Sequence, residues 1–350
     1  MPRNFISIIF IFFFCVGVLF SFIGHFATQV ETNSRDGISV DLASGLPITD
    51  ALFIEQLFEE NEPDLAYQLF VETYGARHPL GHALSHLVGE SLFRHAGLTG
   101  ISSCTSEYGW GCYHGFAIAA FLEEGTELIS KAEEMCKVGL VSAADSGGCL
   151  HGIGHGILAI HGYEYDDLLD SLILCDTLKN TSSQSGCYGG VFMEYNIWTM
   201  KHVTENTNEI RPLESADDHI ALCLQVPNKY SQSCLTEQAA WVIMHEPVFA
   251  AYGEACAQLS NEQKEYCYQG LGRATPVVSP SYEVPVMVPL CLQISEAVGK
   301  SICLEQVIEI ALTHGAEIDA DVCNLQLPDF ARTCERNLQS GKMEARTVLR

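Results

Sequence analysis

Basic residues are scarce in this chain: 18 Lys and Arg stand against 44 Asp and Glu, for a formal net charge of −26. So acidic a surface repels nucleic-acid phosphates, which excludes a nucleic-acid partner, and it disfavours binding to anionic lipid headgroups. The chain also lacks the CxxC, CxxCH, HExxH and GxSxG motifs and any phosphate-binding glycine loop. These absences argue against thiolate zinc sites, c-type haem, a thioredoxin-like centre and the common hydrolase nucleophiles.

Cysteine, by contrast, is abundant and regularly spaced. Fourteen of the 15 cysteines fall into seven pairs whose partners are about 8 to 13 positions apart, and only Cys15 is left over. The second cysteines recur at intervals of roughly 31 to 47 residues, a period typical of stacked two-helix repeats. We therefore predict seven disulfides that each close one helical hairpin: Cys104–Cys112, Cys136–Cys149, Cys175–Cys187, Cys223–Cys234, Cys256–Cys267, Cys291–Cys303 and Cys323–Cys334.

The N-terminus predicts export. Residues 5–23 form a nearly uninterrupted apolar run, long enough to span a bilayer as one helix. Arg3 flanks the run, so the positive-inside rule places the N-terminus in the cytoplasm. We expect residues 1–27 to be an uncleaved signal-anchor, with a cleaved signal peptide and secretion as the alternative. In both cases the bulk of the chain is extracytoplasmic (periplasmic, extracellular or lumenal), where paired cysteines persist as disulfides.

Composition divides the rest of the chain into three parts. Residues 28–46 are polar and contain Gly and Ser, which is typical of a linker. Helical spacing of apolar residues predicts one repeat domain over residues 47–340, followed by a basic C-terminal tail at 341–350. A charged insertion at 203–219 is expected to be an exposed loop. Four prolines at 275–289 predict an extended path that either covers a groove as a lid or links two stacks.

Alignment of the second helices on their leading cysteine shows the repeat directly. The segments CYHGFAIAAF, CLHGIGHGILAI, CYGGVFMEYN and CYQGLGRATP each begin with the second cysteine of a pair. One more unit at residues 76–90 fits without a cysteine, with Ala76 at the cysteine position. The expected fold is all-α: a right-handed solenoid of about eight disulfide-clamped hairpins, preceded by one transmembrane helix. In unit size it resembles tetratricopeptide and Sel1-like repeats, a likeness of architecture that implies no specific activity.

Histidines distinguish the first repeats from the later ones. His78 and His82 occupy the same two alignment positions as His151 and His155, and His114 occupies the first of them. Equivalent positions of neighbouring repeats lie side by side on one face of a solenoid, so these imidazoles should converge. His86, Glu90 and Glu194 are additional candidate ligands. The glycines around the histidines indicate close approach of either a neighbouring helix or a ligand.

Two functions follow from this pattern. The first is a site for a divalent transition metal (zinc, iron or copper), since these ions favour imidazole and carboxylate ligands, and an open coordination position would support catalysis. The second is a non-enzymatic scaffold that binds a peptide or protein on its concave face, with structural histidines. His95, His161, His202, His219 and His314 lie off the aligned positions, and no role is predicted for them.

Overall fold

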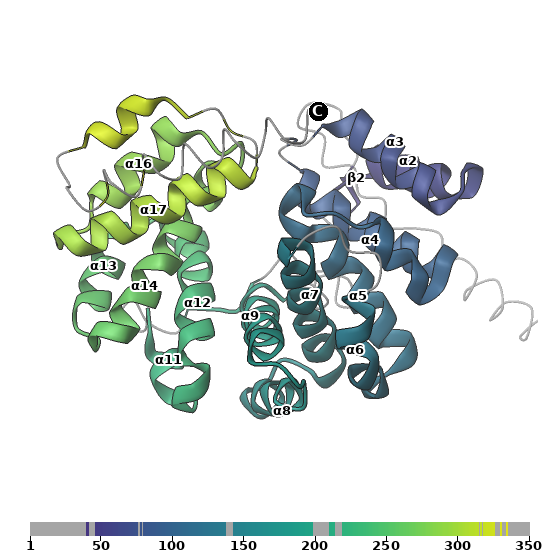
Figure 1. Ribbon diagram of the computed structural model, residues 1–350, viewed down its shortest axis with the longest axis horizontal. Helices are drawn as coiled ribbons and strands as arrows, with labels where there is room; N and C mark the ends of the chain where they lie inside the picture. The colour runs from purple at the N-terminus through teal and green to yellow at the C-terminus, as the bar shows by residue number, and fades with distance from the viewer. Residues whose placement is uncertain are drawn as a thin grey trace, which may run out of the picture.

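The computed structural model in Figure 1 is almost entirely helical. It describes residues 40–41, 46–75, 78, 80–137, 143–198, 210–213, 219–314, 316, 318–325, 330 and 334. The predicted signal-anchor at 1–27 and the basic tail at 341–350 lie outside this set. No helix within the described ranges has the length and apolar character needed to cross a membrane.

The N-terminal half begins with a short antiparallel pairing of β1 (Val40–Asp41) with β2 (Leu46–Pro47), at the end of the predicted linker. Helices and 3-10 turns then follow in pairs. In chain order they are α2 (Ile48–Glu60), α3 (Pro63–Tyr74), α4 (Gly81–Ala96), η1 (Gly97–Ser103), η2 (Glu107–Trp110), α5 (Gly111–Glu124), η3 (Thr126–Leu128), α6 (Ile129–Met135), α7 (Ala143–His161), α8 (Tyr165–Cys175) and α9 (Thr181–Ile197).

The C-terminal half repeats the same arrangement. Its elements are α11 (Ala221–Gln225), η4 (Asn228–Tyr230), α12 (Ser231–His245), α13 (Phe249–Ala257), α14 (Asn261–Arg273), α15 (Thr275–Val278), α16 (Val284–Leu292), α17 (Ala297–Thr313) and η5 (Ala320–Asn324). The longer second helices form one continuous row in the order α4, α5, α7, α9, α12, α14 and α17, each packed on the next. Figure 1 shows this row running from α5 and α7 on one side, through α9, to α12 and α14 on the other.

All seven predicted disulfides are present. In six of them the second cysteine lies on a long helix of the row, and the first lies in or directly after the helix or 3-10 turn that precedes it. Each bridge closes a loop of 8 to 13 residues, which stabilises the folded hairpin by about 3 kcal/mol in the chain-entropy description. Seven disulfides indicate an oxidising, extracytoplasmic compartment.

Glycines bring consecutive helices of the row unusually close together. A Cβ on Gly154 of α7 would overlap the carbonyl oxygen of Cys187 on α9. In the C-terminal half, a Cβ on Gly272 of α14 would lie 2.5 Å from the carbonyl oxygen of Cys303 on α17. The sequence left open whether a helix or a ligand approaches these glycines, and the structure shows that a neighbouring helix does.

The same contact shows that the predicted alignment of the first repeat is wrong. Gly89 of α4 faces the carbonyl oxygen of Cys112 as Gly154 faces that of Cys187. Gly154 follows its own cysteine by five positions, and five positions before Gly89 stands Leu84 rather than Ala76. Because the histidines of α4 recur every four residues, the sequence pattern fits either register. Leu84, which is completely buried, occupies the cysteine position.

The expectation of an extended path at 275–289 is also wrong. Pro276 and Pro285 stand in the first turns of α15 and α16, where a residue without an N–H costs no helical hydrogen bond. Pro280 lies in the turn between the two helices. Pro289 does lie inside α16, but this helix packs on α17 and is clamped to it by the Cys291–Cys303 disulfide.

The charged insertion at 203–219 is described only at 210–213 and 219, and there it is anchored rather than fully exposed. The Arg211 guanidinium donates to the side-chain oxygen of Asn196 at 2.7 Å and stacks on the Trp241 ring at 3.7 Å. The Arg211 carbonyl accepts from the Trp241 indole N–H at 2.6 Å. These contacts tie the insertion to α9 and α12.

Candidate metal centre

Five histidines from three consecutive helices of the row converge. His82 and His86 come from α4, His114 from α5, and His151 and His155 from α7. Among the described residues, two groups of three can each hold a metal ion: His82 with His86 and His114, and His114 with His151 and His155. Within each group one ligand nitrogen per residue lies within 4.8 Å of the others. His114 belongs to both groups.

Helix geometry explains this convergence. Residues four apart lie on one face of a helix, which aligns His82 with His86 and His151 with His155. The glycine contacts then bring the neighbouring helices close enough for the rings to touch. The centroid of the His114 ring lies 5.3 Å from those of His82 and His86, 5.1 Å from that of His151 and 4.4 Å from that of His155.

In the first group, the geometry already resembles that of a metal site. The Nδ1 of His82 lies 2.7 Å from the carbonyl oxygen of Tyr108, so this nitrogen donates and Nε2 carries the lone pair. That Nε2 accepts a hydrogen bond from the Nε2 of His86 at 3.2 Å. A tetrahedral ion with nitrogen ligands at 2.0–2.1 Å separates any two of them by about 3.3 Å. The two imidazoles therefore stand at the spacing of adjacent ligands.

In the second group, a buried carboxylate orients one ligand. The Nδ1 of His155 lies 2.9 Å from Oε2 of Glu194 on α9, and the Tyr163 hydroxyl donates to the other oxygen at 2.5 Å. His155 and Glu194 are almost completely buried. The opposite nitrogen of His155, Nε2, is buried without a hydrogen-bond partner, as is Nδ1 of His114. A carboxylate behind one imidazole nitrogen and a free lone pair on the other is the usual arrangement of a metal-ligating histidine.

The electrostatics keep most of these rings neutral. Burial lowers the pKa of His86, His114 and His151 well below the ordinary value, and the neighbouring imidazoles lower it further. The His82 side chain is exposed, yet desolvation by the protein atoms packed around its ring lowers its pKa, against the opposing effect of the Tyr108 carbonyl. Neutral imidazole is the form that binds metals, so no imidazolium proton has to leave before these rings bind one cation.

Two predicted ligands lie outside both groups. The His78 ring packs edge-on against Tyr74, with centroids 4.9 Å apart, and its Nδ1 accepts from the Leu80 amide. His86, not His78, holds the position equivalent to His151, as the corrected register requires. The rest of the predicted histidine set is brought together.

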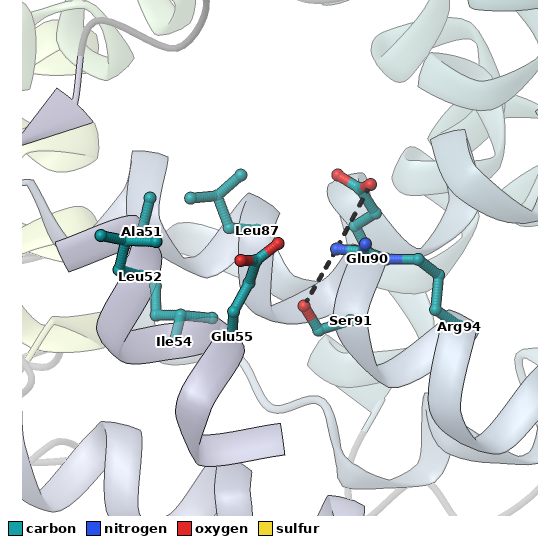
Figure 2. A pocket seen from close by; sticks show the side chains of 8 residues that line it. All are labelled: Ala51, Leu52, Ile54, Glu55, Leu87, Glu90, Ser91 and Arg94. Carbon is teal, nitrogen blue, oxygen red and sulfur yellow. Dashed lines mark hydrogen bonds and ion pairs between the residues drawn. The ribbon is translucent and has the colours of Figure 1, made fainter. Parts of the chain in front are cut away.

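Glu90, the other predicted ligand outside the groups, points into a recess of about 440 Å³ between α2 and α4. Figure 2 shows its carboxylate directed at Arg94, which lies 3.5 Å away and also donates to Ser91. Glu194, by contrast, contacts the second group of histidines through its hydrogen bond with His155.

Two charged residues of the later repeats border the site and were not predicted. Glu237 of α12 is buried, which raises the pKa of its carboxyl, and Arg273 of α14 lies 3.6 Å from it and opposes that shift. A Cβ on Gly189 would lie 3.0 Å from Nδ1 of His151 and 3.6 Å from Oε1 of Glu237, so only this glycine separates the two. Arg273 follows its cysteine by six positions, as His155 does. This shared repeat position could have indicated from the sequence that Arg273 lies near the histidines.

The end of α17, the last long helix, lies close to His82 of α4. His314 caps the C-terminus of α17 and stacks on Tyr282, with centroids 3.9 Å apart. A Cβ on Gly109 would lie 3.3 Å from Nδ1 of His82 and 3.6 Å from Cε1 of His314. The first and last parts of the row therefore meet beside His82, a contact that no local pattern predicts.

Each of the two groups of three histidines could therefore hold a transition-metal ion through its imidazoles. No protein-family model, curated protein or solved structure matches this chain.

Proposed function

We propose that this chain is an exported, membrane-anchored metalloprotein that binds a divalent transition metal through His114, His151 and His155. One observation carries the proposal: His155 is held by Glu194 through Nδ1, while its Nε2 is buried without a partner, and the residue forms a candidate metal-binding group with His114 and His151. A buried polar atom without a partner is costly, and a bound cation would satisfy it. The anchor in this proposal is the apolar run at 5–23.

The ligand chemistry selects a class of ion. Imidazole favours zinc, copper and iron, whereas magnesium and calcium require oxygen ligands. Three protein ligands leave a fourth position for water or a small substrate, as in catalytic zinc sites. A metal-dependent reaction on a small molecule is therefore part of the proposal, with the ion supplying activation of the bound water or substrate.

Elemental analysis tests the proposal directly. The full chain, purified in detergent without a histidine tag, is expected to retain stoichiometric zinc, iron or copper after dialysis. The double variant His151→Ala/His155→Ala should lose the ion bound at His114, His151 and His155, so its metal content should fall below that of the wild type. A matched control, His95→Ala/His161→Ala, removes two histidines outside the groups and should retain it. Wild-type protein that stays free of metal in the presence of all three ions would refute the proposal and favour a structural role for the histidines.

A further inference from the structure

His114 stands between two complete sets of partners. We infer that the two groups bind two transition-metal ions at the same time and that the His114 imidazole bridges them, with one ring nitrogen on each ion. This inference rests on the proposed function, because it takes the ion at His114, His151 and His155 as given. It adds a second ion at His82, His86 and His114.

Each group of histidines has its own hydrogen-bond acceptor that orients one of its rings. The Tyr108 carbonyl holds His82 at 2.7 Å, and the Glu194 carboxylate holds His155 at 2.9 Å. Both contacts engage Nδ1 and leave Nε2 as the lone pair. A single ion would need only one histidine oriented in this way. Two acceptors, one on His82 of the first group and one on His155 of the second, orient a ligand for each of two ions. Outer contacts of this kind fix the tautomer and ring orientation of a ligand.

The backbone that supplies the Tyr108 carbonyl has an unusual conformation. Tyr108, Gly109 and Trp110 have consecutive positive φ angles of 54°, 61° and 62°. Non-glycine residues adopt this left-handed region at a cost, and such strain is concentrated at functional sites. Here the unusual turn precedes α5 and directs its carbonyl at His82. The turn is thus explained if a correctly oriented His82 matters to the protein.

His114 itself lies in a position that suits a bridging ligand. Its ring centroid lies within 5.3 Å of the other four rings, and its Nδ1 is buried without a partner. A neutral imidazole has one lone pair and one N–H, so it can bridge two cations only if that proton leaves. In the bridged state the proton is released to solvent, and the resulting imidazolate donates one lone pair to each ion.

Charge compensation supports two ions in this place. Two dications are unfavourable in a buried site unless anions accompany them. The imidazolate contributes one negative charge and the buried Glu194 another. The buried Glu237 lies just beyond Gly189, next to His151, but Arg273 lies 3.6 Å from it and balances its charge. Compensation for the two ions therefore comes from the imidazolate and from Glu194.

Zinc stoichiometry tests the inference on the full chain in detergent. Wild-type protein is expected to bind two zinc ions per chain. His82→Ala/His86→Ala should bind one, His151→Ala/His155→Ala should bind one, and the control His95→Ala/His161→Ala should bind two. His114→Gln should weaken both sites by at least tenfold. Far-ultraviolet circular dichroism verifies that each variant is folded, and the two double variants keep the test valid if His114→Gln fails to fold.

The outcomes separate the two proposals. No bound zinc, iron or copper refutes the proposed function itself. One zinc per chain that is lost in His151→Ala/His155→Ala but kept in His82→Ala/His86→Ala supports the proposed function and overturns the second ion. One zinc that is lost in both double variants also overturns it, since all five rings then serve a single ion.

Electron paramagnetic resonance with copper tests the bridge. The spectrum should change from that of an isolated Cu²⁺ ion at one equivalent to a magnetically coupled or silent pair at two equivalents. Two independent Cu²⁺ signals at two equivalents would overturn the bridging role of His114.

Discussion

The two halves of the row share one scaffold and differ in the side chains that it presents. Both have disulfide-clamped helices, and in both a glycine five positions after the second cysteine contacts the next helix, Gly154 in α7 and Gly272 in α14. At the second and sixth positions after the cysteine, α7 carries His151 and His155, whereas α14 carries Gln269 and Arg273. The scaffold therefore sets where side chains meet, and a few substitutions on it decide whether a histidine cluster forms there.

Acidification should affect the two halves most unequally. The pKa values of His82, His86, His114 and His151 are lowered in the folded state, while unfolded histidine titrates near 6.5. Below about pH 6.5 the unfolded chain therefore binds more protons, and the stability of the metal-free protein falls as the pH decreases toward the lowered values. This loss of stability should be larger than the effect of any single substitution below, because the pKa values of four rings shift in the same direction.

Hydrogen exchange measured at pH 7.5 and pH 5, after correction for intrinsic rates, can locate this loss. Amides of α5 and α7 should lose more protection than those of α12 and α14, whereas α17 ends at His314, where burial also lowers the pKa, to about 4. Equal losses in both halves would contradict the idea that the acid-sensitive part is the histidine-bearing part.

Glycine substitutions separate scaffold from site. Gly154→Ala and Gly272→Ala each insert a methyl group against a neighbouring helix, and each should destabilise the protein by about 1–3 kcal/mol. Only Gly154→Ala should also weaken metal binding. Gly147→Ala is the matched control in α7: no atom lies within 4 Å of its Cβ, so it should stabilise the helix by up to about 1 kcal/mol. Chemical denaturation together with zinc titration measures both effects.

Substitution of two glutamates, one in each environment, gives the smallest expected effects. Glu194→Gln should weaken metal binding by about 10- to 100-fold, because the amide no longer provides a charged acceptor for His155. Glu90→Gln removes only the half-exposed ion pair with Arg94, so zinc affinity should be unchanged and stability should change by less than about 1 kcal/mol. A loss of affinity in Glu90→Gln would restore Glu90 as a ligand.

Much of this architecture was predictable from local pattern. The even spacing of cysteines predicted all seven disulfides, and the pairing of helices followed from it. The four-residue spacing of histidines on successive second helices predicted that His114, His151 and His155 would meet. Such signals are strong because they depend only on the helical period and on one repeat stacking against the next.

Other features depended on relations that no local pattern contains. The histidine spacing in α4 is the same in two registers, so only the Gly89 contact identified His86 rather than His78 as the equivalent of His151. Prolines that forbid a helix interior are harmless in its first turn, so α15 and α16 were missed. Handedness of the predicted solenoid and the peptide-binding alternative stay predictions.

The sequence by itself determined the helical hairpins, their covalent clamps and the oxidising compartment, because these follow from spacing along the chain. Only the tertiary structure decided which imidazole nitrogens face one another, that Tyr108 and Glu194 orient two of them, and that Glu237, Arg273 and His314 from distant repeats border the same region. The physical reason is that these contacts join residues that are far apart in sequence, and their distances depend on how closely each helix packs on the next.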